Sequence, residues 1–230
     1  MLYKASLAGE MRGSLGGVTA SRNRSGTYLR QRAKPVNPNT PLQNAARVRM
    51  QNLSIDWTQT LTQAERDAWD EYAANVLGLN KLGDSINYTG INWYVSSNAF
   101  ALQCGISRID AAPTTFERAQ APEGLVVTAS EASQELSVTF DTLEAWVNED
   151  DAAMGVFMGL PQNAARNFFN GPFRFAGAIL GDATTPPTSP QTIAVPFPIA
   201  AGQKLFVECK VLRADGRTSE RSRAVFLAGA

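Results

Sequence analysis

Leu125-Val126-Val127-Thr128 and Leu136-Ser137-Val138-Thr139-Phe140 decide the fold, because the hydrophobic period of the chain changes at these two stretches. Before them, apolar residues recur every three or four positions, as in an amphipathic helix. From them onward, apolar and polar residues alternate, as in strands with one buried face. We therefore predict an α+β fold, with helices before residue 113 and antiparallel β-structure from residue 123 to the end.

The alternating pattern continues to the C-terminus in five further segments. Short runs of Asn, Asp, Gly and Pro separate the segments and are typical of turns. The seven predicted strands are residues 125–128, 136–140, 153–160, 173–180, 192–197, 204–212 and 222–227. Seven short antiparallel strands predict a two-sheet β-sandwich over residues 123–230.

Three helices are predicted between residues 40 and 112. Thr40-Pro41-Leu42-Gln43 and Thr62-Gln63-Ala64-Glu65 are capping boxes, which satisfy backbone donors at a helix start. The third helix runs from Thr89 to Cys104, and Gly105 suits its C-terminal cap. The first helix carries a stripe at helical spacing: Leu42, Ala45, Ala46, Arg49, Leu53 and Trp57.

Four aromatic residues are expected in the core of this helical unit: Trp57, Trp69, Trp93 and Phe100. An aromatic ligand box is the alternative, but helical spacing alone accounts for them. Residues 113–122 follow the unit and begin and end with proline, so we predict a linker there.

Residues 1–39 are predicted to form an arm. Residues 1–17 are rich in Gly and Ser and are expected to be a flexible tail or to order on contact. Residues 18–33 predict a β-hairpin, and the prolines in residues 34–39 predict an extended connector. Alternation along the second strand places the side chains of Tyr28, Arg30 and Arg32 on one face. The side chains on the other face are those of Thr27, Leu29 and Gln31. Because an isolated hairpin is marginally stable, it must lean on this chain's body or on another subunit.

Charge is distributed unevenly although the chain as a whole is neutral. Residues 1–34 carry seven basic side chains and a single acidic one, while the rest of the chain is mildly acidic. A basic arm on an acidic body suggests an arm that binds an acidic surface, either a neighbouring subunit or nucleic acid. The alternative is a solvated edge strand whose charges prevent aggregation. Subunit contact is favoured, and nucleic acid is the least favoured partner.

The composition narrows the functional classes. The chain has no histidine, which excludes every mechanism that requires an imidazole, and its two cysteines are too few for a thiolate metal site. We expect no catalytic residue, metal or cofactor. No apolar run is long enough to cross a membrane, and the N-terminus lacks the apolar core of a secretory signal. Synthesis in the host cytoplasm, with no signal peptide and no membrane partner, is expected.

Carboxylate chemistry needs no histidine, so two acidic groups were weighed. Asp67 and Glu71 are four residues apart on the second predicted helix, where a solvated face is the favoured interpretation. Glu149-Asp150-Asp151 could bind a divalent cation, but a polar turn between strands is favoured.

The C-terminal part resembles fibronectin type III domains. The resemblance rests on residues 201–208 and 213–222, which look like the last two strands with a Gly-containing turn and a Ser-x-x-Ser exit. The tyrosine usual at that corner is absent, and Phe206 stands near its place. The resemblance implies a sandwich fold and, for function, a generic adhesion or spacer module.

Residues 13–122 resemble a family of uncharacterised phage and prophage proteins. The shared pattern is a Gly-rich start at Gly16-Gly17, an Arg- and Tyr-containing hairpin, and two segments with Asn-Pro-x-Thr-x-x-Gln and Trp…Leu-Thr-x-x-x-Arg-x-x-Trp signatures. These segments are residues 37–47 and 57–69, and a Gly90…Asn98…Gly105…Pro113 spacing follows. The resemblance implies a role in the virion and supplies no active site.

A non-enzymatic structural protein of a tailed-phage particle is therefore expected. A capsid-associated decoration or cement protein is the first hypothesis, and a neck or tail component is the second. A carbohydrate-binding or carboxylate-based hydrolytic accessory protein is a more distant alternative. The expected partners are other virion subunits, with this chain present in many copies or as a homo-oligomer. The predicted partner-binding residues are Arg22, Arg24, Tyr28, Arg30 and Arg32.

Overall fold

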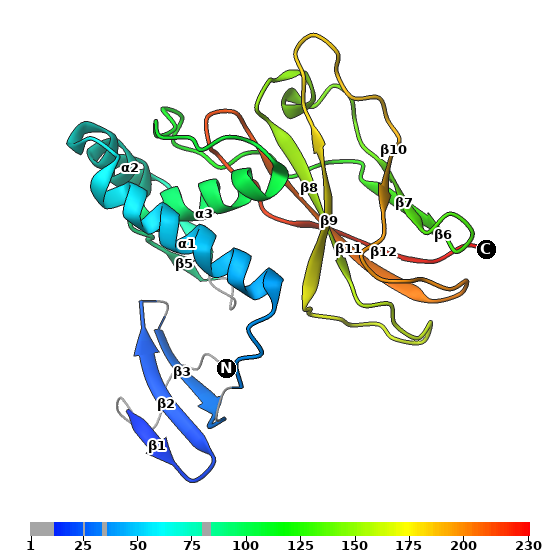
Figure 1. The fold of residues 1–230 in the computed structure, drawn as a ribbon, viewed down its shortest axis with the longest axis horizontal. Helices are drawn as coiled ribbons and strands as arrows, with labels where there is room; N and C mark the ends of the chain where they lie inside the picture. The colour runs from blue at the N-terminus through cyan, green and yellow to red at the C-terminus, as the bar shows by residue number, and fades with distance from the viewer. Residues whose placement is uncertain (1–11, 25, 34–35, 80–83) are drawn as a thin grey trace.

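The computed structural model describes residues 12–24, 26–33, 36–79 and 84–230. The chain is a mixed α+β protein in which an N-terminal β-sheet, three helices and two larger antiparallel sheets follow one another (Figure 1). The N-terminal sheet lies to one side of the helices, and the two larger sheets lie at the opposite end of the molecule (Figure 1). None of the helices in the described residues is long and apolar enough to cross a bilayer.

The three predicted helices are present, and the first two start where the capping boxes predicted. Helices α1 (Pro41–Gln59) and α2 (Gln63–Asn75) each begin at a complete capping box. In the second box the Thr62 amide donates to Glu65 Oε2 at 2.7 Å, and this hydrogen bond holds the pKa of the Glu65 carboxyl below its usual value. Helix α3 (Gly90–Cys104) ends at Gly105, which has a φ of 85°. A short β4–β5 pair (Gly78–Leu79 and Ser85–Ile86) lies between α2 and α3.

All seven predicted strands of the C-terminal part are present. They are β6 (Val126–Ser130), β7 (Glu135–Thr139), β8 (Ala153–Gly159), β9 (Phe173–Leu180), β10 (Gln191–Ala194), β11 (Lys204–Leu212) and β12 (Ser222–Leu227). One antiparallel sheet has the order β10-β7-β6, and the other has the order β12-β11-β8-β9. A 3₁₀ helix, Ala145–Asn148, precedes β8 and contributes the buried Trp146.

The two larger sheets share one hydrophobic core. Its fully buried members include Leu136 and Val138 from β7, Met154 and Val156 from β8, and Val207 from β11. These residues recur every second position, so one face of each strand is buried, as the alternation in the sequence predicted. Strand β8 is buried on both faces because its other side packs against α3.

Helix α3 joins the helical part of the chain to the sheets. Its first half contributes Trp93 and Tyr94 to a core with α1 and α2, and its second half contributes Phe100 and Cys104 to a different cluster. That second cluster also contains Phe157 and Leu212, which come from β8 and β11. Gly155 permits this contact, since a Cβ atom there would lie 2.6 Å from the Phe100 ring.

The predicted linker, residues 113–122, lies against both parts. On the helical side, the Tyr72 hydroxyl donates to the Glu117 carbonyl at 3.4 Å. On the other side, Arg118 forms a 2.6 Å ion pair with Glu220, which lies between β11 and β12. Just before it, Trp69 Nε1 donates to the Asp110 carbonyl at 2.8 Å. The connection is therefore bonded to the helices on one side and to the β-sheets on the other.

Only the second half of the stripe predicted along α1 faces a core. Leu53 is buried and Trp57 is half-buried, but Leu42, Ala45 and Ala46 are exposed, Leu42 by 68%. The physical reason is length. The 19-residue helix is longer than the surface that α2 and α3 offer it, so its first turns extend past them.

Candidate interaction surface on the arm

The N-terminal sheet, called the arm sheet below, has three strands, of which two were predicted. Strands β2 (Val18–Asn23) and β3 (Gly26–Gln31) form the predicted hairpin. Strand β1 (Gly13–Leu15) was missed, because its residues were assigned to a flexible tail. It pairs with β2 through a two-residue Gly16-Gly17 turn in which Gly16 has a φ of 55°. Gly-Gly between two strands favours a two-residue hairpin turn, so the sequence did contain an indication of β1.

The register of the arm sheet divides the predicted partner-binding residues between its faces. Residues directly opposite each other in an antiparallel pair lie on the same face. Tyr28 faces Ser21 and Arg30 faces Thr19 across the β2–β3 pair, so the two side chains share one face, as predicted. The backbone amide of Arg32 donates to the Gly17 carbonyl at 2.8 Å, which extends the pairing by one residue.

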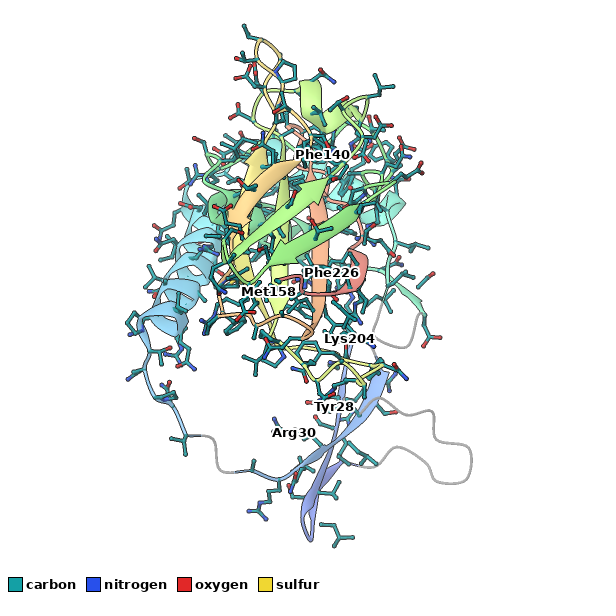
Figure 2. The ribbon with its side chains drawn as sticks, turned by 90° about the vertical axis from the view of Figure 1, so that its right-hand side faces the viewer. Tyr28, Arg30, Phe140, Met158, Lys204 and Phe226 are labelled. Atoms are coloured by element: carbon teal, nitrogen blue, oxygen red, sulfur yellow. The ribbon has the colours of Figure 1, made fainter. Side chains whose placement is uncertain are left out.

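Two of the five predicted residues do not belong to this face. Arg22 pairs with Thr27, and the next pair but one along the strands is Ala20 with Leu29. Residues two apart on a strand share a face, so Arg22 lies on the face of Ala20 and Leu29, opposite to Tyr28 and Arg30. Arg24 is an exposed residue of the turn. The arm thus presents Tyr28, Arg30 and, by alternation, Arg32 as one basic–aromatic face. Figure 2 shows Tyr28 and Arg30 on the arm, apart from the larger sheets near which Phe140 and Phe226 are labelled.

The opposite face of the arm sheet carries a group of apolar side chains beside Arg22. Leu15, Val18, Ala20 and Leu29 line a hollow of about 710 Å³ there, together with Arg12. Leu15 is 88% exposed and Val18 is 44% exposed, so the sheet does not bury its own apolar side chains. A three-stranded sheet is near the lower limit of independent stability, and it gains stability when such a face is covered.

A polar network, called the clasp below, joins the connector of the arm to α1. Arg47 on α1 donates to Asn37 Oδ1 at 2.6 Å and to Asn39 Oδ1 at 3.0 Å. Asn44 Nδ2 donates to the Asn39 carbonyl at 3.3 Å, which helps hold Asn39 at its positive φ of 49°. The clasp fixes the last residues before the helix start, and it explains why Asn37, Asn39 and Arg47 occur together in the sequence.

The exposed half of α1 adds apolar surface next to the arm. Leu42, Val48 and Met50 are about half or more exposed, whereas a helix packed on a core buries such side chains. The clasp connects this helix half to residues 37–39 of the connector. The arm sheet and the first half of α1 both lie outside the buried clusters of the described residues (Figure 1).

The two acidic groups weighed from the sequence have structural roles. Asp67 accepts from Gln63 Nε2 at 2.6 Å along the exposed face of α2. Glu149 pairs with Arg213, and Asp150 accepts from the Ala183 amide at 2.8 Å. These bonds fit the interpretations that the sequence favoured, a solvated helix face and a polar turn. Within the described residues, no group of three or more Cys, Asp or Glu side chains could hold a metal ion.

Comparison with known proteins adds no relative. No protein-family model matches the chain, and no curated protein matches its sequence. The functional argument therefore rests on the geometry of the arm and of the surfaces around it.

Proposed function

We propose that the chain is a non-enzymatic structural subunit of a tailed-phage particle, most simply a capsid-associated decoration protein, anchored by its arm. The observation that carries the proposal is the arm itself. It is a basic sheet that exposes Leu15 and Val18 on one face, and the connector after it is clasped to an exposed half of α1. Surfaces of this kind mark sites of protein–protein contact. Because the body of the chain is acidic, a neighbouring copy or a similarly charged subunit would attract the basic face.

We further propose that residues 123–230 are a fibronectin type III-like sandwich that serves as a spacer or outward-facing module. Three observations support this. The strands number seven, they divide into a three-stranded and a four-stranded antiparallel sheet, and the buried faces of both sheets meet in one core. Chain order also fits a Greek-key connection, since β10 returns to the sheet of β6 and β7 after β8 and β9.

The anchoring role is tested by reversing charge on the basic–aromatic face. The double variant Arg30→Glu/Arg32→Glu should lower the number of copies in purified particles by about tenfold or more, because close opposite-charge pairs across an interface contribute several kcal/mol. Quantitative mass spectrometry of the particles measures the copies. Arg166→Glu/Arg174→Glu, on exposed positions of the body, is the matched control and should be incorporated normally.

Unchanged incorporation of the arm variant would show that the arm does not anchor the protein. Absence of the unaltered protein from particles would overturn the phage role. The same measurement separates shell from neck or tail: hundreds of copies indicate the capsid, and about 6 or 12 indicate a ring at the neck or tail.

A further inference from the structure

A pocket of about 430 Å³ lies between the start of α3 and strand β11. Tyr88 and Trp93 form its aromatic wall, with their ring centroids 5.6 Å apart and their planes nearly perpendicular. Asn92 and Ser96 of α3 add polar groups, and Arg118 and Lys210 add positive charge. Its volume is within the range of sites for small molecules.

Among the described residues, Lys210 leaves one positive charge at this pocket unpaired. Lys210 has no ion-pair partner among the described residues, and its ammonium lies 4.8 Å from the centre of the Phe100 ring. Its charged neighbours are the cations Arg118 and Arg221. The acids nearby are already used: Glu220 pairs with Arg118, and Glu208 pairs with both Arg221 and Arg223.

Two hydrogen-bond donors at the same place also lack acceptors among the described residues. Trp93 is 5% exposed, and these residues offer no partner to its buried indole Nε1–H or to the buried Nε–H of Arg118 beside it. These buried N–H groups add positive potential beneath the pocket wall. The terminal nitrogens of Arg118 are bonded to Glu220 and to the Ser219 carbonyl, so its fork cannot take a phosphate in bidentate fashion.

We propose that this pocket binds the carboxylate of a small organic acid. Lys210 neutralises the carboxylate, Asn92 and Ser96 supply hydrogen bonds, and the rings of Tyr88 and Trp93 contact the carbon skeleton. The pocket offers one ammonium, from Lys210, and single hydrogen-bond donors from Asn92 and Ser96. This set matches a carboxylate, which has one negative charge and two oxygens, better than it matches a phosphate. Aromatic walls favour an acid with an apolar, planar body.

The pocket is tested with benzoate on the full-length, ¹⁵N-labelled chain at constant ionic strength. Benzoate should shift the Trp93 indole signal saturably, while the indole signals of Trp57, Trp69 and Trp146 stay in place. Benzamide has the same shape without the charge, and it should produce no saturable shift. Equal responses to benzoate and benzamide, or no saturable response to benzoate, would overturn the proposal.

Variants of two lysines on β11 test whether the Lys210 ammonium binds the carboxylate of benzoate. Lys210→Met should weaken benzoate binding about tenfold or more, and Lys210→Arg should restore much of it. Lys204→Met is the matched control, six residues earlier on the same strand, and should bind as the unaltered chain does. The ¹⁵N spectrum reports whether each variant is folded. Unchanged binding by a folded Lys210→Met variant would also overturn the proposal.

Discussion

Asn98 illustrates how a single buried polar side chain fixes the path of the chain. It is completely buried on α3, and its amide group is fully used. Nδ2 donates to the Tyr94 and Ile109 carbonyls at 3.1 and 2.9 Å, and Oδ1 accepts from the Ile109 amide at 2.7 Å. Asn98 therefore pins the segment after α3 back onto the helix.

Asn98→Ala should lower the free energy of unfolding by about 2–4 kcal/mol, because it leaves the buried amide and carbonyl of Ile109 without partners. Urea unfolding followed by tryptophan fluorescence measures the change. Asn75→Ala is the control: Asn75 is exposed at the end of α2, and its loss should change stability by less than about 0.5 kcal/mol. A loss at Asn98 no larger than the control's would show that water replaces the side chain's bonds.

Lys210 should make stability rise with pH in alkaline solution. Burial, with Arg221 and Arg118 nearby, lowers the pKa of the Lys210 ammonium to about 8 from its ordinary 10.5. The Cys104 thiol beside it has a pKa raised to about 12 by burial and stays protonated in this range. Between pH 8 and 10.5 the unfolded chain then holds a proton at Lys210 that the folded chain has lost, so stability increases with pH.

Urea midpoints of the unaltered chain and of Lys210→Met, measured from pH 7 to 10.5, isolate this contribution. Other groups titrate alike in both proteins, so the difference belongs to Lys210. The variant should be the more stable protein at pH 7, and its advantage should shrink as the pH rises through 8 to 10.5. An advantage that does not change with pH would mean that the lysine is uncharged, or fully hydrated, throughout the range.

Elements with strong local signals were predicted well from the sequence. The capping boxes at Thr40 and Thr62 placed two helix starts, and alternation placed all seven C-terminal strands. What the sequence could not supply depends on tertiary contacts. Nothing in the α1 pattern indicates that Leu42 lies beyond the reach of α2 and α3. Strand β1 is a different case: its three residues are too few for a period to emerge, and the Gly16-Gly17 turn is the one local feature that indicated it.

The candidate surface was predicted in part for the same reason. A period of two correctly grouped Tyr28 with Arg30, because both lie on one strand. It could not place Arg22 relative to them, since that needs the register between β2 and β3. The pocket beside Lys210 was not predicted at all. Its walls come from residues 78–79, from α3 and from β11, which only the tertiary fold brings together.

At the level of elements, the clasp should set how firmly the arm is held. Arg47→Ala removes the hydrogen bonds from Arg47 to the side chains of Asn37 and Asn39, so the amides of Asn37 and Asn39 should gain motion. Lower heteronuclear NOE values at these two amides would report it. All the groups are exposed, so the free energy of unfolding should change by less than about 1 kcal/mol. The control Arg166→Ala, in a loop of the body, should leave the NOE values of both amides unchanged. Unchanged NOE values at both amides in Arg47→Ala would contradict the role of the clasp.

At the scale of the whole molecule, the helices and the sheets are expected to unfold together. They share the cluster of Phe100, Cys104, Phe157 and Leu212, and residues 113–122 are bonded to both sides. An interface of this kind couples two units when its loss exposes apolar surface on each. A single calorimetric transition is therefore expected for the unaltered chain, although the sequence divides it into a helical part and a β part.

Gly155→Val should break this coupling. Gly155 faces α3, and any added side chain must displace the Phe100 ring, which is held between Phe157 and Lys210. Overpacking of this kind typically costs about 1–3 kcal/mol, and here it acts on the interface alone. The variant should show two calorimetric transitions, or one broadened transition with a van't Hoff enthalpy below the calorimetric enthalpy. Gly177→Ala is the matched control on the neighbouring strand β9. Its added Cβ would lie 2.9 Å from Ile193, inside the β core, so it should lower the midpoint while keeping a single transition. If both variants keep a single transition, the coupling does not depend on the contact at Gly155, and the bonded segment 113–122 alone holds the two parts together.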